Sequence, residues 1–368
     1  MRALAVLGTR PEAIKLAPVV AALREEPGAE CLVVSTGQHR EMLDQMLRLF
    51  ELRVDMDLAV MEHDQRLPDL TADLVRGLGG TVAALRPDWI LVQGDTSTTF
   101  CGALVGFYEG VPVAHVEAGL RTGLDRAPFP EEANRRLVSR LASLHLCPTR
   151  WSAENLVREA VPEERVLVTG NTVIDALYWA VERARRLPSP VPRIRPRRVV
   201  LTMHRRESHG ESIRAVCRAV QELCRRGDVE VVFPVHRSPS VRSVVLPELA
   251  AVDGVQLCDP LDYLELVQLL DSCDIVLSDS GGLQEEAPAL GKPVLVLRET
   301  TERPEAVAAG VARLVGTNVE IILDSVTSLL DDPAAYAAMA LPSSPFGDGR
   351  AASRIVRALL ERHDSIAA

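Results

Sequence analysis

The feature that most constrains the fold is a repeated alternation of short apolar runs with longer stretches of helical spacing. Residues 31–35 and 111–116 are typical runs, and each is followed by a polar or glycine-containing turn and then by a helical pattern. This order predicts a parallel β-sheet with helices on both faces. The same theme restarts at residues 199–202 and continues to residues 294–297. We therefore expect an α/β fold with a parallel sheet in each half of the chain.

The length of the chain sets the expected domain count. A chain of 368 residues is long for one domain and sufficient for two, each with its own core. We expect an N-terminal domain at 1–172 and a C-terminal domain at 173–350, with a last helix near 351–368 packing back on the first domain. Residues 187–197 are rich in proline and arginine, break every regular pattern, and are the candidate linker.

Composition excludes several functional classes. A formal charge of −10 argues against nucleic acid or an anionic membrane as a partner, because both require a broad basic surface. The seven cysteines are odd in number and scattered, which predicts no disulfide framework and no metal site. The chain begins with an apolar run that lacks the features of a signal peptide. No apolar stretch approaches the roughly 20 residues that a membrane-spanning helix needs. We expect a cytoplasmic protein.

The turn after residues 274–277 resembles a nucleotide-binding turn. Ser280, Gly281 and Gly282 precede an Ala- and Glu-rich helical stretch, and glycines there allow close approach of a phosphate to backbone N–H groups. Glu285 and Glu286 lie just inside the helix, and a carboxylate one turn from a phosphate site is well placed to bind both hydroxyls of a ribose. Taken alone, the segment also fits an ordinary βαβ turn with capping glycines.

Acidic residues follow several of the expected strands in the first half. Asp95 and Glu117 each come directly after a strand, and Glu131 opens a helix. Alone, Asp95 fits a helix N-cap and Glu131 a complement to the helix dipole. Because the carboxyl ends of parallel strands meet at one edge, three carboxylates there indicate a functional site.

Basic residues are expected near the same strand ends. Arg10 follows the first strand, and Lys15 lies on the helix after it. His204 follows the first strand of the second half, where a structural and a functional role are about equally supported. Arg303 belongs to a loop, residues 298–304, that is expected to be cationic and to face the glycine turn.

Eight stretches together resemble one known family, the non-hydrolysing UDP-N-acetylglucosamine 2-epimerases. The match runs from residue 1 past residue 318, so it does not depend on a single motif. The stretches are GTRPEAIK (8–15), TGQHREML (36–43), QGDTSTT (93–99), HVEAGLRTG (115–123), PFPEEAN (128–134), TGNTVID (169–175), MHRRES (203–208) and DSGGLQEEAPALGK (279–292).

The resemblance implies two Rossmann-like domains in a glycosyltransferase-B-like fold, an active site in the interdomain cleft, a homodimer, and no metal or nicotinamide cofactor. It implies reversible conversion of UDP-N-acetylglucosamine to UDP-N-acetylmannosamine, which serves the synthesis of cell-envelope polysaccharides. Residue by residue, it implies catalytic carboxylates at Asp95, Glu117 and Glu131, and His204 and Arg10 near the diphosphate. It further places Lys15 and Arg303 in the cleft, Ser280, Gly281 and Gly282 on the phosphates, and Glu286 on the ribose.

Some family members bind a second UDP-N-acetylglucosamine as an activator, and part of that pattern is present. The matching residues are Gln38, His39, Gln65, Arg206 and His236. Glu41 and Asp64 occupy places where a neutral or basic side chain is expected. Because added carboxylates weaken the binding of a diphosphate, the sequence predicts weak or absent activation.

Three other functions remain open from the sequence. A UDP-sugar glycosyltransferase could use the same fold and the same ribose-binding glutamate. A hydrolysing epimerase would release free N-acetylmannosamine, and a sensor would bind the UDP-sugar without turning it over. The three carboxylates favour the reversible epimerase, because a transferase needs at most one base there and a sensor needs none.

Overall fold

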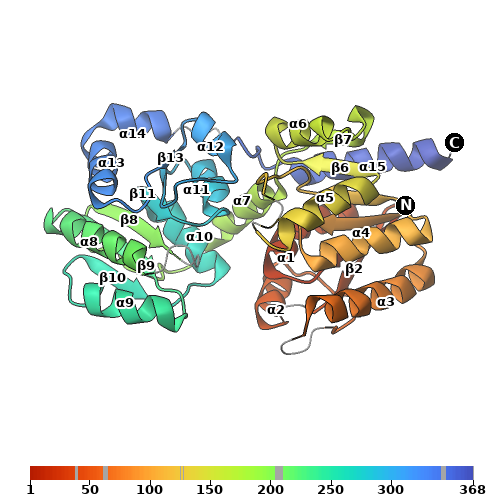
Figure 1. Ribbon diagram of the computed structural model, residues 1–368, viewed down its shortest axis with the longest axis horizontal. Coiled ribbons are helices and arrows are strands. Elements are labelled where there is room, and N and C mark those ends of the chain that lie inside the picture. The colour runs from red at the N-terminus through yellow and green to blue at the C-terminus, as the bar shows by residue number, and fades with distance from the viewer. Residues whose placement is uncertain are drawn as a thin grey trace. The chain divides into compact units, whose positions relative to one another are not determined.

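The computed structural model describes residues 1–37, 40–60, 65–124, 126, 128–203, 210–340 and 345–367. The chain forms two compact units. Unit 1 comprises Met1–Ala176 and Phe346–Ala368, and unit 2 comprises Leu177–Pro345. Figure 1 shows the elements of both units, coloured along the chain.

Unit 1 is built on a seven-stranded parallel sheet with the strand order β3-β2-β1-β4-β5-β6-β7. Its strands are β1 (Arg2–Leu7), β2 (Glu30–Ser35), β3 (Met56–Asp57), β4 (Trp89–Gln93), β5 (Val113–Val116), β6 (Leu144–Cys147) and β7 (Val166–Val168). Its helices are α1 (Arg10–Glu25), α2 (Arg40–Leu49), α3 (Leu67–Leu85), α4 (Ser97–Glu109), α5 (Glu131–Leu141), α6 (Arg150–Arg158), the short 3-10 helix Glu163–Arg165, and α15 (Ala351–Ala367).

Unit 2 is built on a six-stranded parallel sheet with the strand order β10-β9-β8-β11-β12-β13. Its strands are β8 (Arg197–Thr202), β9 (Val229–Pro234), β10 (Val255–Cys258), β11 (Ile275–Ser278), β12 (Val294–Val296) and β13 (Ala312–Leu314). Its helices are α8 (Glu211–Arg225), α9 (Pro239–Leu249), α10 (Tyr263–Ser272), α11 (Leu283–Ala289), α12 (Pro304–Ala308), α13 (Val319–Asp331) and α14 (Pro333–Met339).

The first β-strand and helix show how the sequence sets these elements. Five of the six residues of β1 are buried, as expected of a strand covered on both faces. α1 begins with a capping box between Thr9 and Glu12, and Pro11 occupies its first turn, where a missing N–H is harmless. β1 and α1 therefore present the Gly8–Thr9 turn at the carboxyl end of a central strand.

Each unit has its own apolar core. In unit 1 the core includes Leu4, Leu74 and Ile90, which are fully or almost fully buried. In unit 2 it includes Phe233 and Leu277, both fully buried. Two parallel sheets with separate cores confirm the predicted α/β fold class.

The division between the units falls inside a helix and not in the proline-rich segment. α7 (Thr172–Ala184) begins in unit 1 and continues into unit 2. The expected linker, residues 187–197, belongs to unit 2 and is tied to it. Arg193 donates to the carbonyl of Ser272 at 2.9 Å, and Arg195 donates to the carbonyl of Val229 at 2.8 Å. The linker prediction was wrong because these guanidinium groups bind backbone oxygens and anchor the segment.

The end of the chain returns to unit 1. α15 belongs to unit 1 and packs against α1, and Figure 1 shows it among the elements of that unit. Within the described residues, no helix is both long enough and apolar enough to span a membrane.

Candidate functional site

Asp95 lies in the turn between β4 and α4. Gly94 has φ +77°, and its carbonyl lies 2.7 Å from Nε2 of His115. Burial lowers the pKa of His115 to about 4, so the neutral ring can donate this hydrogen bond near pH 7. The N-cap of α4 is Thr96, whose hydroxyl accepts from the N–H of Thr99 at 3.1 Å. The capping role considered for Asp95 thus belongs to the next residue, and the carboxylate of Asp95 is available for other contacts.

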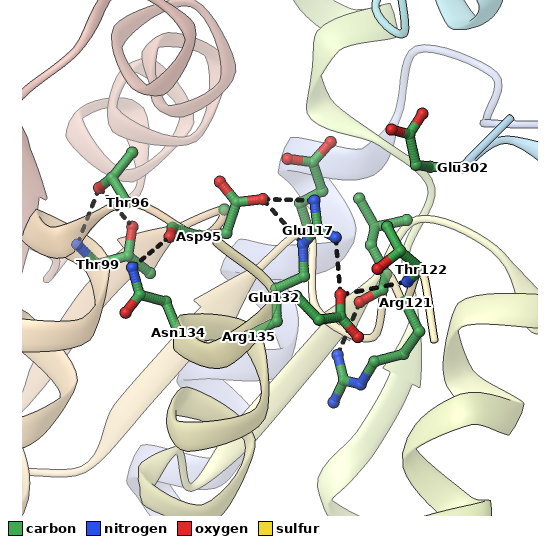
Figure 2. Close-up of polar contacts among 12 residues, drawn as sticks. Asp95, Thr96, Thr99, Glu117, Arg121, Thr122, Glu132, Asn134, Arg135 and Glu302 are labelled. Carbon is green, nitrogen blue, oxygen red and sulfur yellow. Dashed lines mark hydrogen bonds and ion pairs between the residues drawn. The ribbon is translucent and has the colours of Figure 1, made fainter. Parts of the chain in front are cut away.

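Arg135, on α5, holds the carboxylate of Asp95 in place (Figure 2). Its Nε and Nη2 donate to Oδ2 of Asp95 at 2.9 Å and 2.7 Å, while Nη1 donates to Glu132 at 3.0 Å. Asn134 donates to the backbone carbonyl of Asp95 at 2.8 Å. The Arg135 side chain is only 9% exposed, so these charge-assisted bonds are shielded from water. Sequence reasoning did not assign Arg135 a role.

Glu117 follows β5 and is held by three donors. Lys15 donates to Oε1, Asn171 donates to the same oxygen at 3.0 Å, and Gln93 donates to Oε2 at 2.5 Å. Glu117 is 8% exposed and has φ +64°, a backbone region that residues other than glycine rarely adopt. Strain of this kind persists only where the surroundings hold it, and here they fix one carboxylate in one orientation.

The two glutamates that open α5 have different environments. Glu132 is fully buried, and its Oε2 accepts from Arg135 and from the N–H of Thr122 at 3.2 Å, contacts visible in Figure 2. Glu131 is partly exposed, yet no donor among the described residues reaches its buried Oε2. Oε1 of Glu132 likewise has no hydrogen-bond donor among the described residues, with Nε of Arg136 3.6 Å away, so an unsatisfied oxygen does not distinguish the two glutamates.

Glu12 is a buried carboxylate that the sequence analysis did not include. It accepts hydrogen bonds from the N–H groups of Gly8 and Thr9 at 2.8 Å and 2.7 Å, and from the hydroxyl of Thr96 at 2.6 Å. Burial raises its pKa, while these hydrogen bonds oppose the shift. Glu12 thus joins the turn after β1 to the turn after β4. The capping-box spacing of Thr9 and Glu12 was the signal that could have found it.

The sheet places the turns that follow β1, β4 and β5 next to one another. β1, β4 and β5 are neighbours in the sheet, so the turns that follow them share one edge. Lys15 reaches Glu117 from α1, and Arg135 reaches Asp95 from α5. Arg10, at the start of α1 beside this edge, is exposed. This edge of unit 1 therefore carries two carboxylates, those of Asp95 and Glu117, that are each positioned by a cation.

The turn after β11 presents backbone groups. The hydroxyl of Ser278 accepts from the N–H of Ser280 at 2.9 Å and lies 2.7 Å from the hydroxyl of Thr202 on the neighbouring strand β8. Among the described residues, the N–H groups of Gly281 and Gly282 donate to no backbone carbonyl. Backbone N–H groups in such a turn suit an anion such as a phosphate.

Glu286 lies beside this turn, and its neighbour Glu285 has a different partner. The hydroxyl of Tyr263 donates to Glu286 at 3.3 Å, and the Glu286 N–H donates to the carbonyl of Gly282 at 3.0 Å. Glu285 is buried and forms an ion pair with Arg303. The orientation of Arg303 is therefore set by a buried carboxylate of α11.

The loop at residues 298–304 is less cationic than expected. Arg298 pairs with Glu302 at 2.7 Å, just as Arg303 pairs with Glu285. The prediction counted the two arginines of the loop but not the carboxylates that fold against them. The excess positive charge that this loop can offer a ligand is correspondingly small.

Several predicted residues lie outside the described part of the chain or outside these clusters. His204, Gln38, His39 and Arg206 are outside the described residues. Gln65 donates to Asp73 at 2.9 Å, and Nδ1 of the exposed His236 accepts from the N–H of Ser238 at 3.1 Å. In the described ranges, no group of three or more His, Cys, Asp or Glu side chains is arranged to hold a metal ion.

The chain matches known proteins over nearly its whole length. The family model for UDP-N-acetylglucosamine 2-epimerase matches residues 21–360. A UDP-N-acetylglucosamine 2-epimerase of Yersinia pestis is 50% identical, with 98% of each chain covered. The crystal structure of UDP-GlcNAc 2-epimerase from Neisseria meningitidis bound to UDP-GlcNAc has a TM-score of 0.91 and 46% identity, covering 98% of this chain and 100% of that chain.

A more distant structure has the same fold. UDP-GlcNAc 2-epimerase from Methanocaldococcus jannaschii, in complex with UDP-GlcNAc and UDP, has a TM-score of 0.82 and 31% identity. The alignment covers 98% of this chain and 100% of that chain. The clustered carboxylates, the glycine turn and these full-length matches agree. The chain belongs to the UDP-N-acetylglucosamine 2-epimerase family.

Proposed function

We propose that this protein interconverts UDP-N-acetylglucosamine and UDP-N-acetylmannosamine by eliminating UDP and adding it back. The observation that carries the proposal is the edge of unit 1. There, Asp95 and Glu117 follow neighbouring strands, and each is fixed by a cation, Arg135 or Lys15. The relatives that bind UDP-GlcNAc and UDP support the choice of substrate.

The chemistry explains why several carboxylates are needed. The proton on C2 of the sugar is not acidic, so its removal must accompany departure of UDP from C1, which gives 2-acetamidoglucal. A carboxylate base serves the C–H bond, and cations with backbone N–H groups stabilise the departing diphosphate. When UDP adds back and C2 receives a proton on the other face, the configuration at C2 is inverted. A second acid on that opposite face is therefore required.

The residues divide between these two tasks. We assign proton transfer to Asp95, Glu117 and Glu131 in unit 1. We assign His204 a catalytic role near the diphosphate. We assign the phosphates to Ser280, Gly281 and Gly282, the ribose to Glu286, and further contacts to Arg10, Lys15 and Arg303. Ser280 contributes through its side chain in this proposal, because its N–H already binds Ser278.

Incubation with UDP-N-acetylglucosamine in deuterium oxide tests the function. The epimerase places deuterium at C2 and yields UDP-N-acetylmannosamine in a mixture that is the same from either sugar. Free N-acetylmannosamine as the sole product would indicate a hydrolysing epimerase. No exchange, with UDP released only when an acceptor is added, would indicate a glycosyltransferase.

A homodimer and a cytoplasmic location are part of the proposal. Phe107 and Tyr108 at the end of α4 are 62% and 66% exposed, and Leu137 on the adjacent α5 is 49% exposed. Large exposed apolar side chains on neighbouring helices favour an interface there. Sedimentation of the wild type and of a Phe107→Ser, Tyr108→Ser variant tests this surface, since the variant is expected to be monomeric.

Activation by a second UDP-N-acetylglucosamine is proposed to be weak or absent. Besides the acidic Glu41 and Asp64, the amide of Gln65 is already engaged by Asp73. The rate is therefore expected to follow a hyperbolic dependence on substrate concentration. A strongly sigmoidal curve that Arg206→Ala abolishes would contradict this.

A further inference from the structure

The chain passes between the two units at two points, and the segments on the unit 1 side of these points lie together. The first passage is within α7, between Ala176 and Leu177, and the second is between Pro345 and Phe346. Residues 169–175 lead into the first passage, and residues 346–354 follow the second. Both segments belong to unit 1.

Backbone contacts join the two segments. The N–H of Asn171 donates to the carbonyl of Phe346 at 2.6 Å. Gly170 and Gly347 face one another, and a Cβ on Gly170 would lie 3.3 Å from the Cα of Gly347. Both have positive φ, +88° and +136°, so glycine serves both the backbone conformation and the close approach.

The side chain of Asp175 fixes the same two segments further along. Its carboxylate accepts from the N–H groups of Ala351 and Ala352 at 3.2 Å and 2.9 Å, which are at the start of α15. Arg354 donates to the carbonyl of Thr169 at 3.0 Å. Hydrogen bonds therefore join the segments before and after unit 2 into one connected structure within unit 1.

Asn171 connects this structure to Glu117. Its side chain is almost completely buried, with the residue 1% exposed. Oδ1 accepts from the N–H of Val173 at 3.1 Å at the start of α7, and Nδ2 donates to Oε1 of Glu117 at 3.0 Å. One amide thus binds the first turn of α7 with its oxygen and the carboxylate with its nitrogen.

The other two donors to Glu117 come from elsewhere in unit 1. Lys15 reaches it from α1 and Gln93 from the end of β4. Among these three donors to Glu117, Asn171 is the one that belongs to the segment leading into α7. Loss of its N–H would leave Oε1 with Lys15 and free the carboxylate to turn toward that cation.

We propose that Asn171 is a positioning residue that sets the orientation of the Glu117 carboxylate relative to the segment through which the chain leaves unit 1. The inference rests on the proposed function of Glu117 in proton transfer. Asn171 does not itself exchange a proton with the sugar. Its contribution is to hold Glu117 at the geometry that the reaction needs, since small misplacements of a catalytic group are costly.

The substitution Asn171→Asp tests this role. It keeps the oxygen that binds Val173 and replaces the donor to Glu117 by a second carboxylate. Turnover is expected to fall by about tenfold or more while KM stays within about threefold, because geometry at the reacting atoms is lost and binding is retained. The matched control is Asn155→Asp, which removes an amide donor to the carbonyl of Gly119, 3.0 Å away. The control is expected to keep turnover within about threefold.

A second measurement does not depend on turnover. The ¹³C signal of the Glu117 carboxyl, assigned by its loss in Glu117→Gln, is followed against pH. In Asn171→Ala, which removes the donor without adding a charge, its titration midpoint is expected to rise by about half a pH unit or more, since a hydrogen bond to the charged carboxylate is lost, and Asn155→Ala is expected to leave it unchanged. A merely structural role of Asn171 would lower thermal stability without this shift.

The results that overturn the inference are distinct from those that overturn the function. An unchanged midpoint in Asn171→Ala together with turnover in Asn171→Asp within about twofold of the wild type would remove the role of Asn171. If the wild type places no deuterium at C2, the proposed function fails, and the carboxyl titration still decides whether Asn171 positions Glu117.

Discussion

The two units share one sheet topology but differ in what they place at the carboxyl ends of their strands. Both sheets are parallel, and their strand orders correspond when β8 is aligned with β1. At this edge unit 1 offers the charged side chains of Asp95 and Glu117, each held by a cation. Unit 2 offers the backbone of Gly281 and Gly282. One architecture therefore supports two kinds of chemistry, because function depends on the turns and not on the sheet.

The difference matches what each part of the proposed substrate requires. A diphosphate carries fixed charge and is well bound by backbone N–H groups, which need no side chain and cost little to order. A proton transfer requires a titratable group at a defined position, and burial with a paired cation provides that position. Substitutions confined to one unit test whether the two tasks are separate.

The largest expected effect is on unit 1. Asp95→Asn, Glu117→Gln and Glu131→Gln are each expected to lower turnover by more than about a hundredfold, the usual scale for a lost acid or base. Steady-state rates with UDP-N-acetylglucosamine measure this. The exposed Glu109 at the end of α4 provides a matched control, as Glu109→Gln is expected to have normal activity. Near-normal turnover in two of the three variants would contradict the assignment.

The corresponding change in unit 2 is expected to act on binding. Glu286→Gln removes the charge proposed to bind the ribose hydroxyls, and UDP affinity is expected to fall by about tenfold to a hundredfold. Isothermal titration with UDP measures it. Glu320→Gln, on the exposed start of α13, is the control and is expected to bind UDP as the wild type does. An unchanged affinity in Glu286→Gln would place the ribose elsewhere.

A smaller effect is expected where an arginine orients a carboxylate. Arg135→Lys keeps the positive charge but cannot contact both Asp95 and Glu132 with a planar guanidinium, so turnover is expected to fall by about tenfold. UDP affinity should not change. The neighbouring Arg136, whose side chain is 44% exposed, offers the control Arg136→Lys, expected to be within about twofold of the wild type. Turnover in Arg135→Lys within about twofold of the wild type, as in the control, would show that the positive charge suffices without the planar guanidinium.

The smallest effect on activity is expected from a buried histidine in the sheet of unit 1. His145 lies beside His115 in the register of β5 and β6, and no described group binds either of its ring nitrogens. Burial, with His115, Arg165 and Arg121 nearby, lowers the pKa of His145 to about 3. Below the unfolded pKa of about 6.5 the unfolded chain therefore binds a proton that the folded chain does not.

Because of this difference in proton binding, the free energy of unfolding is at its full value above about pH 6.5. It decreases as the pH falls toward about 3, the pKa of His145 in the folded chain. One such group accounts for about 2 kcal/mol between pH 6.5 and pH 5. His145→Leu removes the titration and leaves no partner unsatisfied. Urea unfolding at both pH values is expected to show a smaller loss of stability in the variant, while turnover at pH 7 is unchanged. An identical pH dependence in both proteins would contradict a neutral buried His145.

The sequence was sufficient for the fold and for the location of the carboxylates in the chain. Alternating strands and helices predict parallel sheets, and parallel sheets bring Asp95 and Glu117 to one edge. It could not identify Arg135 or Asn171, because their contacts join residues far apart in the chain. The N-cap question at Asp95 also required coordinates, since Thr96 beside it is an equally good cap.

The most direct test of the account is the affinity for UDP of a chain that carries Asp95→Asn, Glu117→Gln and Glu131→Gln together. If unit 2 holds the nucleotide and unit 1 transfers the protons, this chain places no deuterium at C2 but binds UDP at least as tightly as the wild type. Affinity weaker by more than about tenfold would contradict the division, because the carboxylates would then be part of the nucleotide site.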